Sequence, residues 1–267
     1  MGDEVVTDAL WARLEPLIPL PQRRFRHPGR RRCSDRAALE GILFVARSGI
    51  GWNQLPTALF GASGATCWRR LAEWQEAGVW QRLHQQVLTE LRAAEKLELS
   101  IALVDGSHLR ALKRGDHVGP SPVDRAKPGS KHHLITDATG TPLAVTLTGG
   151  NRHDVTQLIP LLDALPIIGG RRGRPWRRPR YLYADRGYDY DKYRRLLRER
   201  GIVPVIARRG TAHGSGLGTV RWPVERSFAW LHAFKRLRTR YERRADIHHA
   251  LLTLACAVIC LRKLILN

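Results

Sequence analysis

Residues 101–110, IALVDGSHLR, decide the fold together with a second stretch, YLYADRGYDY, at residues 181–190. In each stretch a short apolar run typical of a β-strand leads into an aspartate, Asp105 in the first and Asp185 in the second. We expect the first strand to end at Asp105 and a long polar connection to follow it. An acidic side chain at the end of a buried strand usually has a functional reason, because burial disfavours its charged form.

A third acidic residue lies in the segment RWPVERSFAWL, residues 221–231, whose apolar spacing predicts a helix that starts at about Pro223. At about 100° per residue, Arg221, Glu225 and His232 lie on one face of this helix. A carboxylate between these two basic side chains favours a site that binds a cation and a phosphate. The alternative is an ordinary intrahelical salt bridge between Arg221 and Glu225.

Strand and helix patterns alternate across this part of the chain. Two strands of a hairpin are predicted after the first strand, followed by a helix from Asp154, the strand before Asp185, a helix, a further strand and the helix of Glu225. This is the order of the ribonuclease H-like fold, an α/β class with a mixed sheet flanked by helices. The order places the strand of Asp105 beside that of Asp185 and packs the Glu225 helix over them. We therefore expect the three carboxylates to meet.

The N-terminal part, residues 1–95, shows only helical patterns, with short helices and tight turns that favour an all-α domain of the helix-turn-helix type. In the helix expected after Ser63, the apolar face points inward and Arg69 and Arg70 point elsewhere. These two arginines are the candidates for reading DNA. The alternative is a small helical bundle that only packs on its neighbour. We divide the chain into a DNA-binding domain, 1–95, and a catalytic domain, 96–267.

The charge of the chain is strongly positive, with 45 Lys and Arg against 24 Asp and Glu, a net charge of +21. Such an excess favours nucleic acid or an anionic membrane as partner. Arginine-rich runs at 23–32, 171–180 and 235–244 are expected to contact phosphates. The apolar run at 250–261 is shorter than a membrane span and predicts a buried core helix. DNA or RNA is therefore the expected partner, and no membrane is.

The predicted donors at the site are oxygen atoms, which Mg²⁺ prefers. Two divalent ions about 4 Å apart can activate a water and stabilise the leaving oxygen in phosphodiester cleavage. His132 and His133 do not add to this set, because neighbouring strand residues face opposite ways. The four cysteines match no zinc spacing.

Several segments resemble the DDE transposases of small bacterial insertion sequences, namely RAKPGSKHHLITDATGTPL, TGGNRHDVTQLIPLLD, ADRGYDYDKYRRLLRERGIVPVIARRG, HGSGLGTVRWPVERSFAWLHAFKRLRTRYERRADIH and LACAVICLRKL. The stretch ALEGILFVARSGIGWNQLPTALFGASGATCWRRLAEWQEAGVWQRL is similar to their helical DNA-binding domain. The resemblance covers nearly the whole chain. It implies a ribonuclease H-like catalytic domain, Mg²⁺ or Mn²⁺, and cutting and rejoining of the ends of the element.

The resemblance also assigns residues. It places the catalytic and metal-binding triad at Asp105, Asp185 and Glu225. In the related signature of tyrosine, arginine, glutamate and lysine, Arg221 and Glu225 fit. Gly218 stands at the tyrosine position and His232 at the lysine position, so Lys235 is a nearby substitute cation. Arg221, His232 and Lys235 are thus candidates for contacting DNA.

Our hypothesis from the sequence is a transposase that binds the terminal inverted repeats of its insertion sequence. It would cleave and transfer DNA strands with two Mg²⁺ or Mn²⁺ ions per active site. The expected partners are double-stranded DNA, both the repeats and the target, and a second copy in a dimeric synaptic complex. The expected location is the bacterial cytoplasm, at the nucleoid. The alternatives are an inactive DNA-binding protein of this fold and a metal-dependent nuclease without strand transfer.

Overall fold

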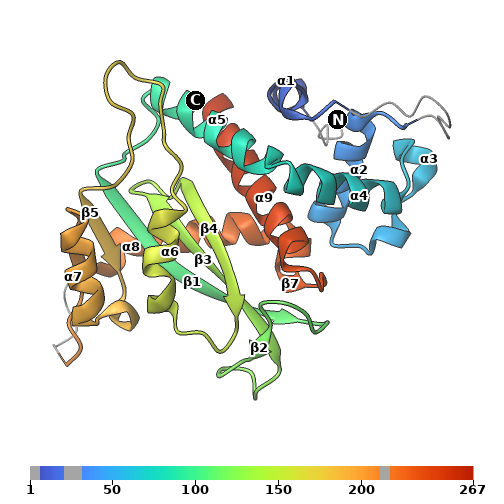
Figure 1. Ribbon diagram of the computed structural model, residues 1–267. Coiled ribbons are helices and arrows are strands. Elements are labelled where there is room, and N and C mark those ends of the chain that lie inside the picture. The colour runs from blue at the N-terminus through green and yellow to red at the C-terminus, as the bar shows by residue number, and fades with distance from the viewer. Residues whose placement is uncertain (1–6, 21–31, 211–216, 267) are drawn as a thin grey trace.

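The structure, a computed structural model, describes residues 7–20, 32–210 and 217–266. Its N-terminal part is helical, as predicted, with the α-helices α1 (Asp8–Leu14), α2 (Asp35–Ser48), α3 (Thr57–Phe60), α4 (Gly64–Glu76) and α5 (Val79–Ala93), and the 3₁₀ turns η1 (Glu15–Leu17) and η2 (Trp52–Gln54). These helices lie together on one side of the molecule (Figure 1). The arginine-rich run at 23–32 falls, except for Arg32, outside the described residues.

Local sequence signals set the ends of these helices. The Ser34 and Ser63 side chains accept hydrogen bonds from the first turns of α2 and α4. Gly49 ends α2 in the left-handed region, with φ of 78°, where a residue without a side chain is favoured. The apolar faces predicted for α2, α4 and α5 are all buried. The N-terminal helices are therefore held by one apolar core.

The rest of the chain is built on a mixed sheet whose main strands are β1 (Ile101–Ala111), β3 (Pro128–Asp137), β4 (Pro142–Gly149), β5 (Tyr181–Ala184) and β6 (Val203–Ile206). Two short strands, β2 (Gly119–Pro120) and β7 (Thr239–Arg240), pair with the start of β3 and the end of β1. The main strands lie in the order β4-β3-β1-β5-β6, antiparallel from β4 to β1 and parallel from β1 to β6. The predicted ribonuclease H-like mixed sheet is confirmed.

One predicted boundary in the sheet is wrong. β1 does not end at Asp105 but continues to Ala111. Its polar second half is held by antiparallel pairing with β3, which runs as far as Arg110 opposite Gly129. Long-range pairing decides the length of this strand, and the local polarity of the sequence does not report it.

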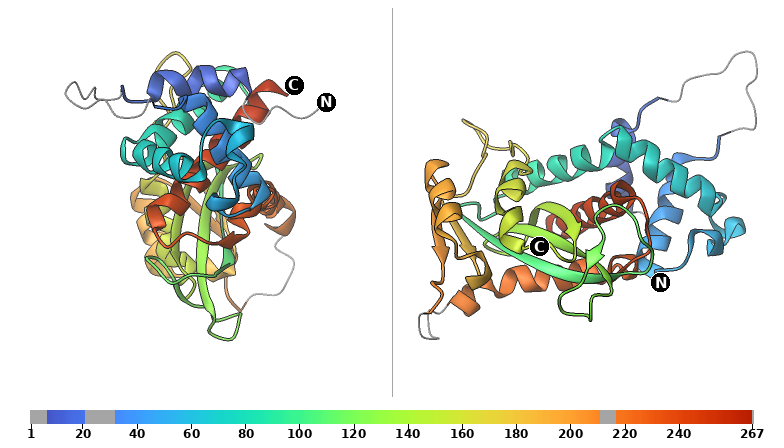
Figure 2. Two further views of the ribbon diagram at one scale, coloured as in Figure 1. Left: turned by 90° about the vertical axis from the view of Figure 1, so that its right-hand side faces the viewer. Right: turned by 60° about the horizontal axis from the view of Figure 1, so that its bottom comes forward.

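Helices cover both faces of the sheet (Figures 1 and 2). On one face lie η3 (Asp154–Gln157) and α6 (Leu158–Asp163), with α7 (Asp191–Glu199) beside them. On the other lie α8 (Leu217–His232) and α9 (Ala245–Ile265). The predicted start of α8 is also wrong, because the helix begins before Pro223 and contains it. Proline in the interior of a helix is unusual.

α9 joins the two halves of the molecule. It packs against α4 and α5 on one side and against β4 and α8 on the other, and the buried residues form one continuous apolar core. Among the described residues it is the one helix long and apolar enough to cross a membrane, yet 78% of that apolar window is buried. The predicted core helix is confirmed, although it is longer than the apolar run suggested. The predicted division at residue 95 falls between the end of α5 and the start of β1 and stays a prediction.

Candidate active site

Strand register brings the two aspartates side by side. β1 and β5 pair in parallel, with Leu103 opposite Tyr183, and Asp105 and Asp185 each follow two residues further along the chain. β5 ends at Ala184, so that the chain leaves the sheet at Asp185, whose Oδ1 accepts a hydrogen bond of 2.8 Å from the Gly187 amide. The aspartates thus stand where the two strands part.

Asp105 faces the helix α8. Its Oδ2 lies 3.2 Å from Nη2 of Arg221, and its Oδ1 accepts a 2.8 Å hydrogen bond from the amide of Gly106. The side chains of this ion pair are 21% exposed for Asp105 and 15% for Arg221. Glu225, one turn further along α8, is exposed. The alternative, an intrahelical salt bridge between Arg221 and Glu225, is therefore replaced by an ion pair between Arg221 on the helix and Asp105 on the sheet.

The electrostatics show that the three predicted carboxylates share one neighbourhood. The pKa of Asp105 is raised from 3.8 to about 6, first by burial and then by the negative charges of Asp185 and Glu225, while Gly106 and Arg221 oppose the rise. No three His, Cys, Asp or Glu side chains of the described residues converge closely enough to hold a metal ion as they stand. The donor set of carboxylate oxygens under mutual repulsion still fits a hard divalent cation, which would neutralise it.

The other predicted site residues are placed in different surroundings. His232 lies away from the carboxylates, with its ring centroid 6.4 Å from that of His132, and burial lowers its pKa. Lys235 is exposed in η5 (Lys235–Leu237). Arg69 is exposed on α4, whereas Arg70 is not free. Its guanidinium, 12% exposed, bonds Asp35 at 2.9 Å and a second carboxylate at 2.7 Å.

Two of the basic runs have unequal surroundings. In the run 235–244, Arg236 forms a buried ion pair of 2.7 Å with Glu242. Arg240 is fully buried, and its donors bind backbone carbonyls and a serine hydroxyl. The expected phosphate contacts are wrong for these two arginines, which hold the fold. The run 171–180 is mostly exposed.

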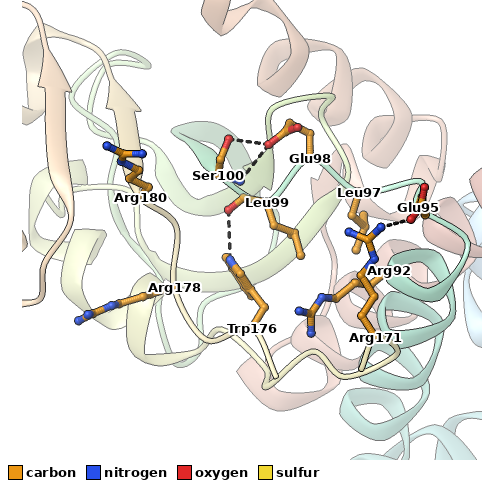
Figure 3. Close-up of a pocket in the computed structure, with 10 residues that line it drawn as sticks. All are labelled: Arg92, Glu95, Leu97, Glu98, Leu99, Ser100, Arg171, Trp176, Arg178 and Arg180. Atoms are coloured by element: carbon orange, nitrogen blue, oxygen red, sulfur yellow. Dashed lines mark hydrogen bonds and ion pairs between the residues drawn. The ribbon is translucent and has the colours of Figure 1, made fainter. Parts of the chain in front are cut away.

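A cavity of about 550 Å³ lies away from the carboxylates, where the end of α5 meets the loop before β5 (Figure 3). Trp176 donates a hydrogen bond to the carbonyl of Leu99, and Arg171 pairs with Glu95 at its wall. The lining residues of this cavity include none of the predicted site residues.

A group of polar side chains lies near Asp105. His132 and His133 face opposite ways, to His248 and to Thr148, and the side of His133 also carries Asp154. Asp154 accepts a 3.0 Å bond from Lys131. A Cβ at Gly106, the residue after Asp105, would meet Asp154 Oδ1 at 3.0 Å, so Asp154 packs closely against β1. Sequence reasoning missed the buried Tyr188 of η4 (Arg186–Tyr188), which no local pattern indicated.

Comparison with known families agrees with this fold. The model described as transposase DDE domain matches residues 96–260, and the model of putative transposases of the IS4/5 family matches residues 6–84. The chain belongs to the DDE-domain transposases, enzymes of phosphoryl transfer on DNA, and this membership implies dependence on a divalent metal in general.

Within this family the chain is a transposase of a small bacterial insertion sequence. It is 67% identical over 142 residues to the putative transposase of IS402 from Burkholderia cepacia, a match that covers 53% of this chain and 67% of that protein. An uncharacterized 16.2 kDa protein of the same element is 49% identical over 123 residues, 46% of this chain and 84% of that protein. The solved Mos1 strand transfer complex aligns at 11% identity with a TM-score of 0.31, over 87% of this chain and 81% of that chain. A likeness this distant says nothing more about the site.

Proposed function

We propose that Asp105, Asp185 and Glu225 are the carboxylates that bind the divalent metal and carry out cleavage and transfer of DNA strands. The observation that supports this most is that all three interact at one place, where the pKa of Asp105 is raised first by burial and then by the charges of Asp185 and Glu225. The metal is Mg²⁺ or Mn²⁺, as two ions. When bound, such ions activate a water or a 3′ hydroxyl and stabilise the leaving oxygen.

The protein's own groups have separate tasks at this site. Asp105 and Asp185 supply oxygen donors from adjacent strands, and Glu225 supplies one from the helix that packs over them. Arg221 holds Asp105 in the free protein and is the cation nearest to an incoming phosphate. Lys235, exposed beyond the helix, is a second candidate for a phosphate contact. His232 is a weaker candidate, since its ring lies among other histidines.

The substrates of this activity are the terminal inverted repeats of the element and its target DNA. Arg69 is the candidate for reading the repeats, because it is exposed on α4 while its neighbour Arg70 is bonded to acidic side chains. Two ends must be held together for transfer, so the active form is a dimer on DNA. The place of action is the bacterial cytoplasm, at the nucleoid.

The test is a supercoiled plasmid that carries the repeats flanking the gene, incubated with the protein and Mg²⁺. Joined products support a transposase, hydrolysis alone supports a nuclease, and binding alone supports an inactive protein of this fold. Asp105→Ala should abolish cleavage and spare binding in a gel-shift assay. Cleavage that survives this substitution would refute the assignment of the site.

A further inference from the structure

A buried tyrosine lies beside the proposed carboxylates without a hydrogen-bond partner. Tyr188, at the end of η4 and three positions after Asp185, is 1% exposed. Its hydroxyl finds no partner among the described residues. Buried hydroxyl groups nearly always have one, because a hydroxyl that has lost water and gained nothing destabilises the fold. An unpaired group of this kind beside an active site suggests a partner that arrives later.

The groups near this hydroxyl include three carboxylates, which are hydrogen-bond acceptors. The pKa of Tyr188 is raised well above its usual value, first by burial and then by the negative charges of Asp105, Asp154 and Asp185, while Arg221 opposes the rise. An ordinary phenol already keeps its proton at neutral pH, so the Tyr188 hydroxyl is a hydrogen-bond donor. Asp154 comes from η3, which contacts η4.

Asp105 would need another hydrogen-bond donor once Arg221 leaves it. In the free protein its Oδ1 is bonded by the amide of Gly106 and its Oδ2 by Arg221. Once Arg221 turns to a DNA phosphate, Oδ2 loses this donor. A carboxylate that must hold an ion needs a second bond to fix its orientation.

We infer that the Tyr188 hydroxyl replaces Arg221 as the hydrogen-bond donor to Asp105 when DNA binds, and so holds this carboxylate for cleavage. This inference rests on the proposed function, because it requires Asp105 to act in cleavage. Tyr188 is a positioning residue, buried away from DNA, that acts through Asp105.

The experiment compares Tyr188→Phe, which removes only the hydroxyl, with Tyr193→Phe on α7, where the ring is partly exposed. Without metal, Y188F should be as resistant to urea as the wild type, or more so, since an unpaired hydroxyl is gone. With Mg²⁺ and the plasmid carrying the repeats, its cleavage should slow about 10- to 100-fold, and the Mg²⁺ concentration for half-maximal cleavage should rise. Binding to the repeats should not change. Y193F should behave as wild type in every respect.

Three results would overturn the inference: cleavage by Y188F at the wild-type rate, an unchanged requirement for Mg²⁺, or a metal-free Y188F protein that is less stable than wild type. The last would mean that the hydroxyl already has a partner in the free protein. Asp105→Ala run in parallel separates the two proposals. If Asp105→Ala still cleaves, the proposed site itself is wrong, whereas an inactive Asp105→Ala beside an unimpaired Y188F removes only the role of Tyr188.

Discussion

Replacing Asp105 by asparagine should make the metal-free protein more stable at neutral pH. The folded protein keeps the proton of Asp105 up to a pKa of about 6, whereas the unfolded chain releases it near 3.8. Between these values the folded state binds more protons, so its stability falls as the pH rises. At about 1.36 kcal/mol for each pH unit, the loss is about 3 kcal/mol and is complete above pH 6. Asparagine has no such charge, so Asp105→Asn should recover up to about 3 kcal/mol at pH 7.5.

The assay is urea unfolding of both proteins in EDTA between pH 3.5 and about 7.5, the range that the linkage covers. The curves should coincide at the acid end and diverge as the pH rises. Asp116→Asn, in an exposed loop, is the control and should follow the wild type. Added Mg²⁺ should stabilise the wild type and not Asp105→Asn. If Asp105→Asn is no more stable than wild type at pH 7.5, burial and the neighbouring carboxylates do not raise the pKa of Asp105 as described.

Four further substitutions test other parts of the molecule. Burial lowers the pKa of His84 from 6.5 to about 4, so the unfolded chain takes up the proton first as the pH falls. The free energy of unfolding should drop by about 3 kcal/mol between pH 6.5 and pH 4. His84→Gln should flatten that part of the acid-unfolding curve. Gly106→Ala should cost about 1–3 kcal/mol in thermal unfolding, because its Cβ would press on Asp154 at 3.0 Å; an unchanged melting temperature would contradict the tight contact. Arg69→Ala should weaken DNA binding and reduce the salt dependence by about one phosphate contact, measured by fluorescence anisotropy. Arg70→Ala should instead lower stability by about 1–2 kcal/mol, and the reverse pattern would exchange the two roles.

The place of Asp105 beside Asp185 could be predicted from the sequence because both residues stand at recognisable positions, whereas their joint role with Glu225 stays a prediction. An apolar run that leads into Asp105 or Asp185 is a local signal, and the order of strands and helices gives the register that sets them side by side. The end of β1 was not predictable in this way. Ser107 to Ala111 look like a polar connection, and only the partner strand β3 makes them part of the sheet.

The basic residues show a different limit. Charge counting assigned the whole run 235–244 to phosphates, yet Arg240 is fully buried with its donors satisfied by backbone carbonyls and a hydroxyl. Arg70 is bonded to acidic side chains that are distant in the sequence or on the same helix. Whether an arginine faces water depends on what folds over it, and no local pattern records that. Tyr188 is a similar case, since its unpaired hydroxyl exists only in three dimensions.

Because α9 packs between α4, α5 and the sheet, the N-terminal helices and the sheet are held at a fixed distance from each other. A surface on α4 and a carboxylate on β1 that share one continuous core stay at a constant separation. If α4 reads the DNA and the carboxylate on β1 takes part in cutting, as we propose, the protein sets the spacing in base pairs between the sequence that is read and the bond that is cut. Inserting half a helical turn of DNA between the recognised sequence and the cut site should abolish cutting and leave no shifted cut. The scissile phosphate would then lie on the opposite side of the duplex.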